Sequence, residues 1–397
     1  MAVIPITEPG PPAKGFALFD LGFRPFFLAA ALLAVMIQPL WLLAVMGHLA
    51  LPDYFGATGW HAHEMVFGYS SAVIAGFLLT AGGNWTGQVL AKGAMLMALV
   101  LLWLAPRILI FVPAVPVEIL AILDLLFLPI LALLLLRPVI KIKQWRNIAF
   151  PVLLILMALG NLLVHAQALG WSESTAETGL LLALYVIVLV IVLMAGRVVP
   201  FFIERGAQGA RVRKWKWVEI ISIASVVVLI PAELIWPGSV FYQAVVAVAA
   251  VSHGIRWWGW LSRPAWRVPL LWVLIGGYFW VVVGLVLLLA ASLSEIPKSL
   301  ALHAFTVGGI GVLTLGMMAR VSLGHTGRML QPHPVMAWSF ALINLAVVFR
   351  VLLPLVDIFP YEVDVALATV VWEAAFLIFL VIYTPILIQP RVDGRPQ

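Results

Sequence analysis

The residues best suited to chemistry in this 397-residue chain are histidines that stand beside long apolar runs. The run that begins "WHAHEM" places His61, His63 and Glu64 at its start. His165 closes "GNLLVH", and His303 opens "HAFTVG". Imidazole is a ligand for iron and copper, and it can also transfer protons near neutral pH. These positions therefore predict a metal or haem site.

Depth within the predicted membrane spans strengthens this hypothesis. His63, His165 and His303 each lie about four or five residues from the outer end of a different span, which is roughly 6–8 Å below the boundary at about 1.5 Å per residue. Ionisable residues inside spans usually face the bundle interior and mark function. The alternative is that each histidine is an interfacial anchor or a hydrogen-bonded core residue.

The spacing of His61 and His63 separates their roles. Two residues on a helix correspond to about 200° of rotation, so two helical residues with this spacing do not bind one ion together. We therefore expect two neighbouring roles. Glu64 is a candidate to orient a ligand imidazole or to act as the catalytic proton-handling group.

A second group of polar residues falls at the inner ends of the spans. The run "ARVSLGHTGRML" contains Arg320, His325 and Arg328, and His253 lies at the inner end of another span. One interpretation is a cradle for haem propionates, or a second metal site formed by His253 and His325. The other is a basic loop with turn glycines.

Further ionisable residues lie inside the predicted spans. They must pair with one another or line water, because an unpaired charge at a helix centre costs at least about 2.5–3.5 kcal/mol. A proton path and structural ion pairs both remain open. These residues are Asp124, Glu233, Glu373, Arg107 and Arg350.

The composition requires a membrane for these elements. The chain is 64% hydrophobic and 10% charged, with mean hydropathy +1.12, whereas a soluble domain is about 25% charged. It contains no cysteine, which excludes disulfides, thiolate-ligated clusters and c-type haem attachment. Any metal must use His, Met, carboxylate or backbone oxygen.

The apolar runs predict a single all-α domain over residues 1–397 with about twelve spans. All Lys and Arg residues except Arg107, Lys298 and Arg350 fall at cytoplasmic ends if both termini are cytoplasmic. The net charge of +6 then reflects topology, and we expect no nucleic-acid partner. Residues 1–22 and 389–397 become cytoplasmic terminal segments, no cleaved signal is expected, and no separate soluble domain fits. The predicted spans are 23–47, 60–81, 88–110, 116–136, 147–169, 178–196, 217–236, 239–257, 268–292, 299–320, 334–355 and 364–388.

Five stretches resemble the NnrS family of nitric-oxide-response membrane proteins. The resemblance implies a twelve-helix protein of the bacterial inner membrane that carries haem and copper and is linked to resistance to nitric oxide. No ligand assignment follows from it. The stretches are "FRPFFL", "WHAHEMVFGYSSAVIAGFLLTAGGNWTG", "GNLLVH", "GRVVPFF" and "HAFTVGGIGVLTLGMMARVSLGHTGR".

We therefore expect a haem and copper protein that binds or converts nitric oxide or another small diatomic molecule, with a b-type haem and an electron donor. His63 and His303 are the expected haem ligands, facing each other from two spans, and His61 and His165 are candidates for copper or a sixth ligand. The residues do not distinguish reduction, oxidation and sequestration. The alternatives are a secondary transporter or channel for metal or haem, and a sensor or assembly factor without catalysis.

Overall fold

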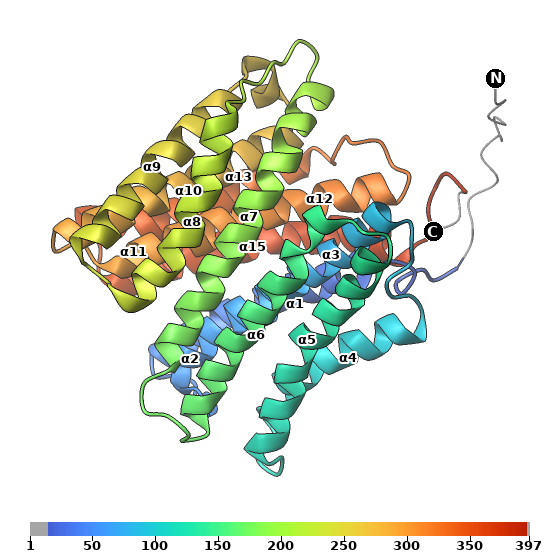
Figure 1. Ribbon diagram of the computed structural model, residues 1–397. Coiled ribbons are helices and arrows are strands. Elements are labelled where there is room, and N and C mark those ends of the chain that lie inside the picture. Colours follow the sequence, from blue (N-terminus) through green and yellow to red (C-terminus); the bar gives the residue numbers. More distant parts are fainter. Residues whose placement is uncertain (1–14, 395–397) are drawn as a thin grey trace, which may run out of the picture.

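The computed structural model describes residues 15–394, and within that range the regular elements are all helical (Figure 1). Residues 1–14 and 395–397, parts of the predicted cytoplasmic segments, lie outside the described residues. The elements are α1 (Phe23–Val45), α2 (Gly56–His63), η1 (Glu64–Ser70), α3 (Ser71–Thr86), α4 (Ala94–Leu109), α5 (Val117–Lys141), η2 (Trp145–Asn147), α6 (Ala149–Ala168), α7 (Ala176–Gly206), α8 (Lys216–Ile235), α9 (Val240–Trp260), η3 (Arg263–Arg267), α10 (Pro269–Leu293), α11 (Lys298–His303), η4 (Ala304–Val312), α12 (Leu313–His325), α13 (Val335–Val347), η5 (Val348–Leu352), α14 (Leu353–Val356) and α15 (Tyr361–Ile388).

Ten helical segments of the described chain are long and apolar enough to cross a membrane. Every predicted span overlaps a helical segment, but two segments fall outside this group. One is α4, which has only 16 residues. The other is α9, whose 21 residues include the buried His253 and Arg256. The structure thus shows a polytopic membrane protein, while the count of twelve spans and their orientation remain predictions.

The helices form one bundle in which α7 is central. It packs against α6, α8 and α10, while α4 and α5 lie at one edge of the bundle and α8 and α9 at the opposite edge (Figure 1). Helices α6 and α7 approach closely at Gly160 and Gly179, where an added Cβ on Gly160 would lie 2.6 Å from the Gly179 carbonyl. Small residues permit such contact between membrane helices. This contact fixes α6, which carries His165.

The two ends of the described chain lie together. The Ala17 amide donates a hydrogen bond to the Ile388 carbonyl over 2.8 Å. Nearby, the buried Arg24 guanidinium donates to the carbonyls of Leu387 and Gln389 at the end of α15. An even number of crossings brings both ends to one side, in agreement with this contact.

One helix extends beyond its predicted span. The loop expected from Arg197 to Lys216 is shorter, because α7 continues to Gly206 and only residues 207–215 connect it to α8. The Arg197 side chain stabilises this extension of α7, because it donates hydrogen bonds to the Asn147 side chain and to the Arg146 carbonyl, both in η2. The polar end of α7 therefore remains helical beyond the apolar run.

Three π-helical segments interrupt the helices at notable places. His63 directly precedes η1, His303 directly precedes η4, and Arg350 lies within η5. π-helical turns are rare and frequently occur at functional sites. In η1, an added Cβ on Gly68 would lie 2.7 Å from the Glu64 carboxylate and 2.8 Å from the end of the Leu33 side chain, so these side chains would have to move. In the sequence, His63 and His303 are each followed five residues later by a glycine, Gly68 or Gly308, and in both places the intervening residues form a π-helical turn.

Candidate functional site

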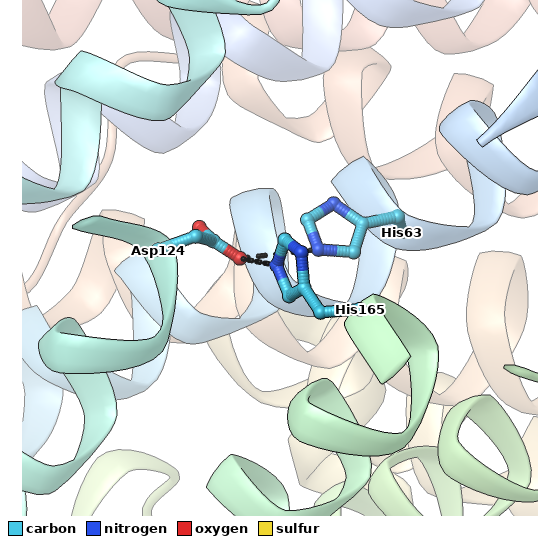
Figure 2. A group of neighbouring side chains, drawn as sticks. All are labelled: His63, Asp124 and His165. Carbon is cyan, nitrogen blue, oxygen red and sulfur yellow. Dashed lines mark hydrogen bonds and ion pairs between the residues drawn. The ribbon is translucent and has the colours of Figure 1, made fainter. Parts of the chain in front are cut away.

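Three buried side chains from three helical segments converge near one end of the bundle. His63 comes from α2, Asp124 from α5 and His165 from α6, and each is at most 3% exposed (Figure 2). Both His63 Nε2 and His165 Nε2 lie 3.1 Å from Asp124 Oδ2. One ligand atom from each residue lies within 4.8 Å of the other two. Two imidazoles and a carboxylate at this spacing can bind one metal ion.

The remaining ring nitrogens are held by neighbouring polar groups. Glu64 Oε1 lies 3.0 Å from His63 Nδ1, so Nδ1 donates and Nε2 faces Asp124. The Tyr54 hydroxyl lies 2.9 Å from His165 Nδ1. Burial, reinforced by the charge of Asp124, raises the pKa of Tyr54, so its hydroxyl stays protonated, and its oxygen can accept from His165 Nδ1 when Nε2 of that ring binds a metal. Such partners orient imidazole ligands in metal sites.

An amide completes the cluster. Asn161 lies four residues before His165, on the same face of α6. Its amide group donates to Asp124 Oδ2 over 2.7 Å, and its oxygen lies 3.0 Å from His63 Nε2. The carboxylate is thereby fixed between the two imidazoles.

The charges of this cluster do not balance without a further cation. Arg107 forms an ion pair with Asp124, and its Nε lies 3.2 Å from Glu64 Oε2. With neutral imidazoles, one guanidinium and two carboxylates leave a net charge of −1. A buried uncompensated charge is costly. Either a proton on His63 or a bound metal cation supplies the missing positive charge.

The π-helical segment η1 contributes to the placement of Arg107. The Arg107 guanidinium donates to the Phe67 carbonyl over 2.7 Å, and the Trp103 indole donates to the Gly68 carbonyl over 3.1 Å. These carbonyls accept side-chain donors from α4. Helix α4, which carries Arg107, thus supplies hydrogen-bond donors for backbone carbonyls of the π-helical turn after His63.

A second group of polar side chains lines a cavity of about 380 Å³ on the other side of α2. His61, His303 and Arg350 line it together with Gln38, Glu177, several hydroxyl side chains and apolar residues of neighbouring helices. Volumes of about 300–1,000 Å³ are typical of sites for small molecules and cofactors. The cavity therefore joins α2, α11 and η5 around a space that can hold a ligand.

The histidines of the cavity present nitrogen atoms that lack a protein partner. His303 Nδ1 lies 2.7 Å from the Ser299 carbonyl, so Nδ1 carries the hydrogen and Nε2 of the neutral ring keeps a lone pair. The His61 ring stacks on Trp41 at 4.3 Å, and its buried Nδ1 has no hydrogen-bond partner among residues 15–394. Free imidazole nitrogens in a cavity can coordinate iron or copper.

Arg350 brings a positive charge to this cavity. One of its terminal nitrogens donates to the Tyr361 hydroxyl over 2.8 Å, whereas the other, Nη1, is buried and has no hydrogen-bond partner in the described part of the chain. The residue is 6% exposed. An unpartnered guanidinium nitrogen at a cavity wall suits an anionic group of a ligand, because charge-assisted hydrogen bonds are strong.

The sequence matches one protein family over nearly its whole length. Residues 17–391 match the family described as NnrS protein. The chain belongs to the NnrS family. No curated protein matched the sequence. NnrS membership indicates a membrane protein of the nitric-oxide response, in agreement with the helical bundle.

In this NnrS chain, the histidines of the outer layer group differently from the expected pairing. His63 and His303 were expected to face each other, but His63 instead joins His165 and Asp124. His303 lines a cavity together with His61. The expected separation of His61 and His63 agrees with the structure, since these two residues face different groups.

The inner residues form no comparable group in the described part of the chain. His253 Nε2 donates to the Ser222 carbonyl over 2.9 Å, and its Nδ1 accepts from the Tyr278 hydroxyl over 2.6 Å. Both nitrogens are therefore occupied. The His325 ring packs on Phe23 instead, at 5.8 Å. The structure does not bring His253 and His325 together as the expected second metal site.

Arg320 and Arg328, the two residues expected to hold haem propionates, have different surroundings. Arg320 lies over the Phe202 ring, with its guanidinium carbon 3.8 Å from the ring centroid. Arg328 lies outside the spans, and burial lowers its pKa. Neither residue lines the cavity of His61 and His303. These arginines belong to the opposite end of the bundle.

Sequence reasoning did not assign several residues to the site. Asp124, Arg107 and Arg350 were recognised only as intramembrane charges, and their depth within apolar runs was the available signal. Asn161 carried a local signal, since it precedes His165 by one helical turn. Tyr54 lies in a connection between spans, and nothing in its sequence context indicated a role.

Proposed function

We propose that this NnrS protein is a copper and haem protein of the bacterial inner membrane that binds or converts nitric oxide in defence against nitrosative stress. One observation carries the proposal. His61 and His63, two residues apart on α2, face two separate sets of donor atoms. One helical turn would thus contribute a histidine to each of two adjacent sites, an arrangement that suits a protein with two metal centres.

The cluster of His63, His165 and Asp124 is the proposed copper site. Imidazole nitrogen suits copper, and the carboxylate supplies the negative charge that a cation needs. The net charge of −1 around Arg107 and Glu64 favours binding of a cation there. Copper bound at these residues would supply a redox centre that exchanges one electron.

The cavity of His61, His303 and Arg350 is the proposed haem site. Either His303, through Nε2, or His61 would hold the haem iron, and Arg350 Nη1 is placed to pair with a propionate. A haem of b type fits, because the chain has no cysteine for covalent attachment. Bound haem iron would supply a coordination position for nitric oxide.

Glu64 contacts two members of the cluster around Asp124. Its Oε1 accepts from His63 Nδ1, while its Oε2 pairs with Arg107. A carboxylate in this position can hold the imidazole in one orientation and can hold a proton at the edge of the cluster. We therefore retain Glu64 as the proposed proton-handling residue. Any turnover also needs an electron donor, which we expect to be a separate protein or small molecule.

The decisive experiment measures both cofactors in detergent-purified protein. We expect a haem Soret band that shifts on reduction and again on addition of nitric oxide, together with copper by elemental analysis. His303→Ala should remove haem and retain copper, whereas His165→Ala should remove copper and retain haem. The exposed His333 provides a control, and His333→Ala should retain both.

Several results would contradict the proposal. Wild-type protein without any haem absorbance would remove the haem assignment, and bound metal without a chromophore would favour transport. If the histidine variants lose both cofactors in equal proportion, the assignment of separate sites is wrong. Size-exclusion profiles of the same samples distinguish that result from misfolding.

A further inference from the structure

A basic pocket lies at the end of the bundle opposite His63 and His303, where the distribution of Lys and Arg predicts the cytoplasm. Its volume is about 810 Å³. It is bounded by the end of α3, the connection from α5 to η2, the last turns of α7 and the connection from α7 to α8. Side chains that line it include Trp85, Lys143, Trp145, Arg146, Arg197 and Lys214.

The residues that line the pocket carry positive charges and no negative charge. Four of the lining residues are cations, and no acidic residue lines it. Among residues 15–394, none of these four cations forms an ion pair. The nearest carboxylate behind Gly196 belongs to Glu219, which pairs with Arg256. An anion in this pocket would meet several unpaired positive charges.

One of the cations is held rigidly. Arg197 donates to Asn147 Oδ1 over 2.9 Å and to the Arg146 carbonyl over 3.0 Å. Its guanidinium carbon also lies 5.3 Å from the centroid of the Phe150 ring. A fixed guanidinium loses little side-chain freedom on binding an anion. A basic loop that only determines topology does not need this anchoring.

The backbone around the pocket is also specialised. Lys143 has φ of 57°, in the left-handed region that non-glycine residues rarely adopt. The turn is fixed because the Gln144 amide donates to the Trp85 carbonyl over 2.6 Å and the Asn147 amide donates to Gln144 over 2.8 Å. Strained backbone of this kind occurs often at ligand sites. The strain here places a lysine at the pocket.

The surroundings of the pocket fit a lipid. Trp145 is 58% exposed, as expected for a tryptophan at a membrane interface. Close to the lining residues in sequence, Ile142, Val152 and Phe201 expose large apolar side chains. A lipid whose headgroup lies in the pocket would place its acyl chains beside such apolar side chains. Basic pockets between membrane helices on the cytoplasmic side bind anionic headgroups.

We propose that this pocket binds the phosphate group of an anionic phospholipid, with Arg197 as the fixed anchor and Lys143 and Lys214 as mobile partners. The site is independent of the proposed haem and copper sites. Phosphatidylglycerol carries the required chemistry, a phosphodiester on a glycerol backbone with two acyl chains. Free phosphate shares the charge but lacks the apolar part.

The test compares two double variants that remove equal charge. Lys143→Gln with Lys214→Gln removes two exposed pocket cations whose side chains make no hydrogen bond to the described residues. Lys141→Gln with Lys216→Gln removes two exposed neighbours that do not line the pocket. Binding of phosphatidylglycerol to delipidated, detergent-purified protein is followed by native mass spectrometry and by thermal unfolding.

We expect phosphatidylglycerol to stabilise the wild-type protein, and phosphatidylcholine to have little effect. Loss of the two pocket lysines should weaken phosphatidylglycerol binding by about tenfold or more, at roughly 1 kcal/mol for each basic residue near a membrane surface. The control variant should retain binding close to wild type.

Three results would overturn the proposal. Equal weakening in both double variants would show diffuse surface attraction. Equal stabilisation by millimolar inorganic phosphate would identify free phosphate as the ligand. Equal binding of phosphatidylcholine would show that the pocket does not select an anion.

Discussion

Substitution of Asp124 by asparagine tests the proposed copper site most directly. The side chain keeps its size but loses its charge, so Arg107 keeps only its pair with Glu64 and the two imidazoles lose an anionic neighbour. With neutral imidazoles, the net charge of the cluster then changes from −1 to zero. A metal cation would no longer neutralise the cluster but would leave it with a buried excess of positive charge.

The expected loss can be estimated from these contacts. Removal of a group that only supports a ligand typically lowers metal affinity by about 10–100-fold, so removal of a proposed ligand charge should exceed about 100-fold. Removal of one partner of a buried ion pair destabilises a protein by about 3–5 kcal/mol. We expect about 3 kcal/mol for Asp124→Asn, because Glu64 still lies 3.2 Å from Arg107.

The assay measures copper and haem per protein in the same purified sample, together with thermal unfolding. Asp124→Asn should contain less than a tenth of the wild-type copper and should retain its haem. Glu118→Gln is the matched control, because Glu118 is an exposed carboxylate near the start of the same helix. Wild-type copper content in folded Asp124→Asn protein would refute the assignment of this residue as a ligand.

Three further predictions concern the surroundings of the two sites. Gly68→Ala should destabilise the protein by about 1–3 kcal/mol in thermal unfolding, because the new Cβ would lie 2.7 Å from Glu64. The control is Gly59→Ala, whose Cβ meets no atom closer than 3.5 Å and whose thermal stability should stay near wild type. Arg350→Met should lower haem content severalfold, and Arg350→Lys should restore part of it if a propionate is the partner, as pyridine haemochrome spectra can measure. His253→Ala should lower thermal stability without loss of either cofactor, since both ring nitrogens bond to protein groups; loss of copper in that variant would contradict its structural role.

The helical architecture could be predicted because apolar runs determine where membrane helices lie. The extension of α7 to Gly206 could not, because it depends on contacts of Arg197 with a different segment. The π-helical segments were also missed. Only the shared histidine-to-glycine spacing at His63 and His303 indicated that these two segments have something in common.

The candidate site was predicted in part. The i,i+2 spacing of His61 and His63 correctly implied that they face different neighbours, because helix geometry alone determines it. Which histidine faces which depends on how each helix is rotated about its axis. That rotation depends on contacts such as the one between Gly160 and Gly179, which only the packed bundle reveals.

The π-helical turns also set a condition on chain length. A π-helical turn takes in more residues than an α-helical turn, so each such segment holds more residues than a regular helix needs between the same two ends. Deletion of one residue within 64–70 or 304–312 would allow the helix to regularise with little rotation of the part that follows, whereas a deletion within α3 or α12 would rotate the following part by about 100°. Relatives that lack one residue in either π-helical stretch should therefore keep the bundle and the histidine, and lose only the irregular turn beside it.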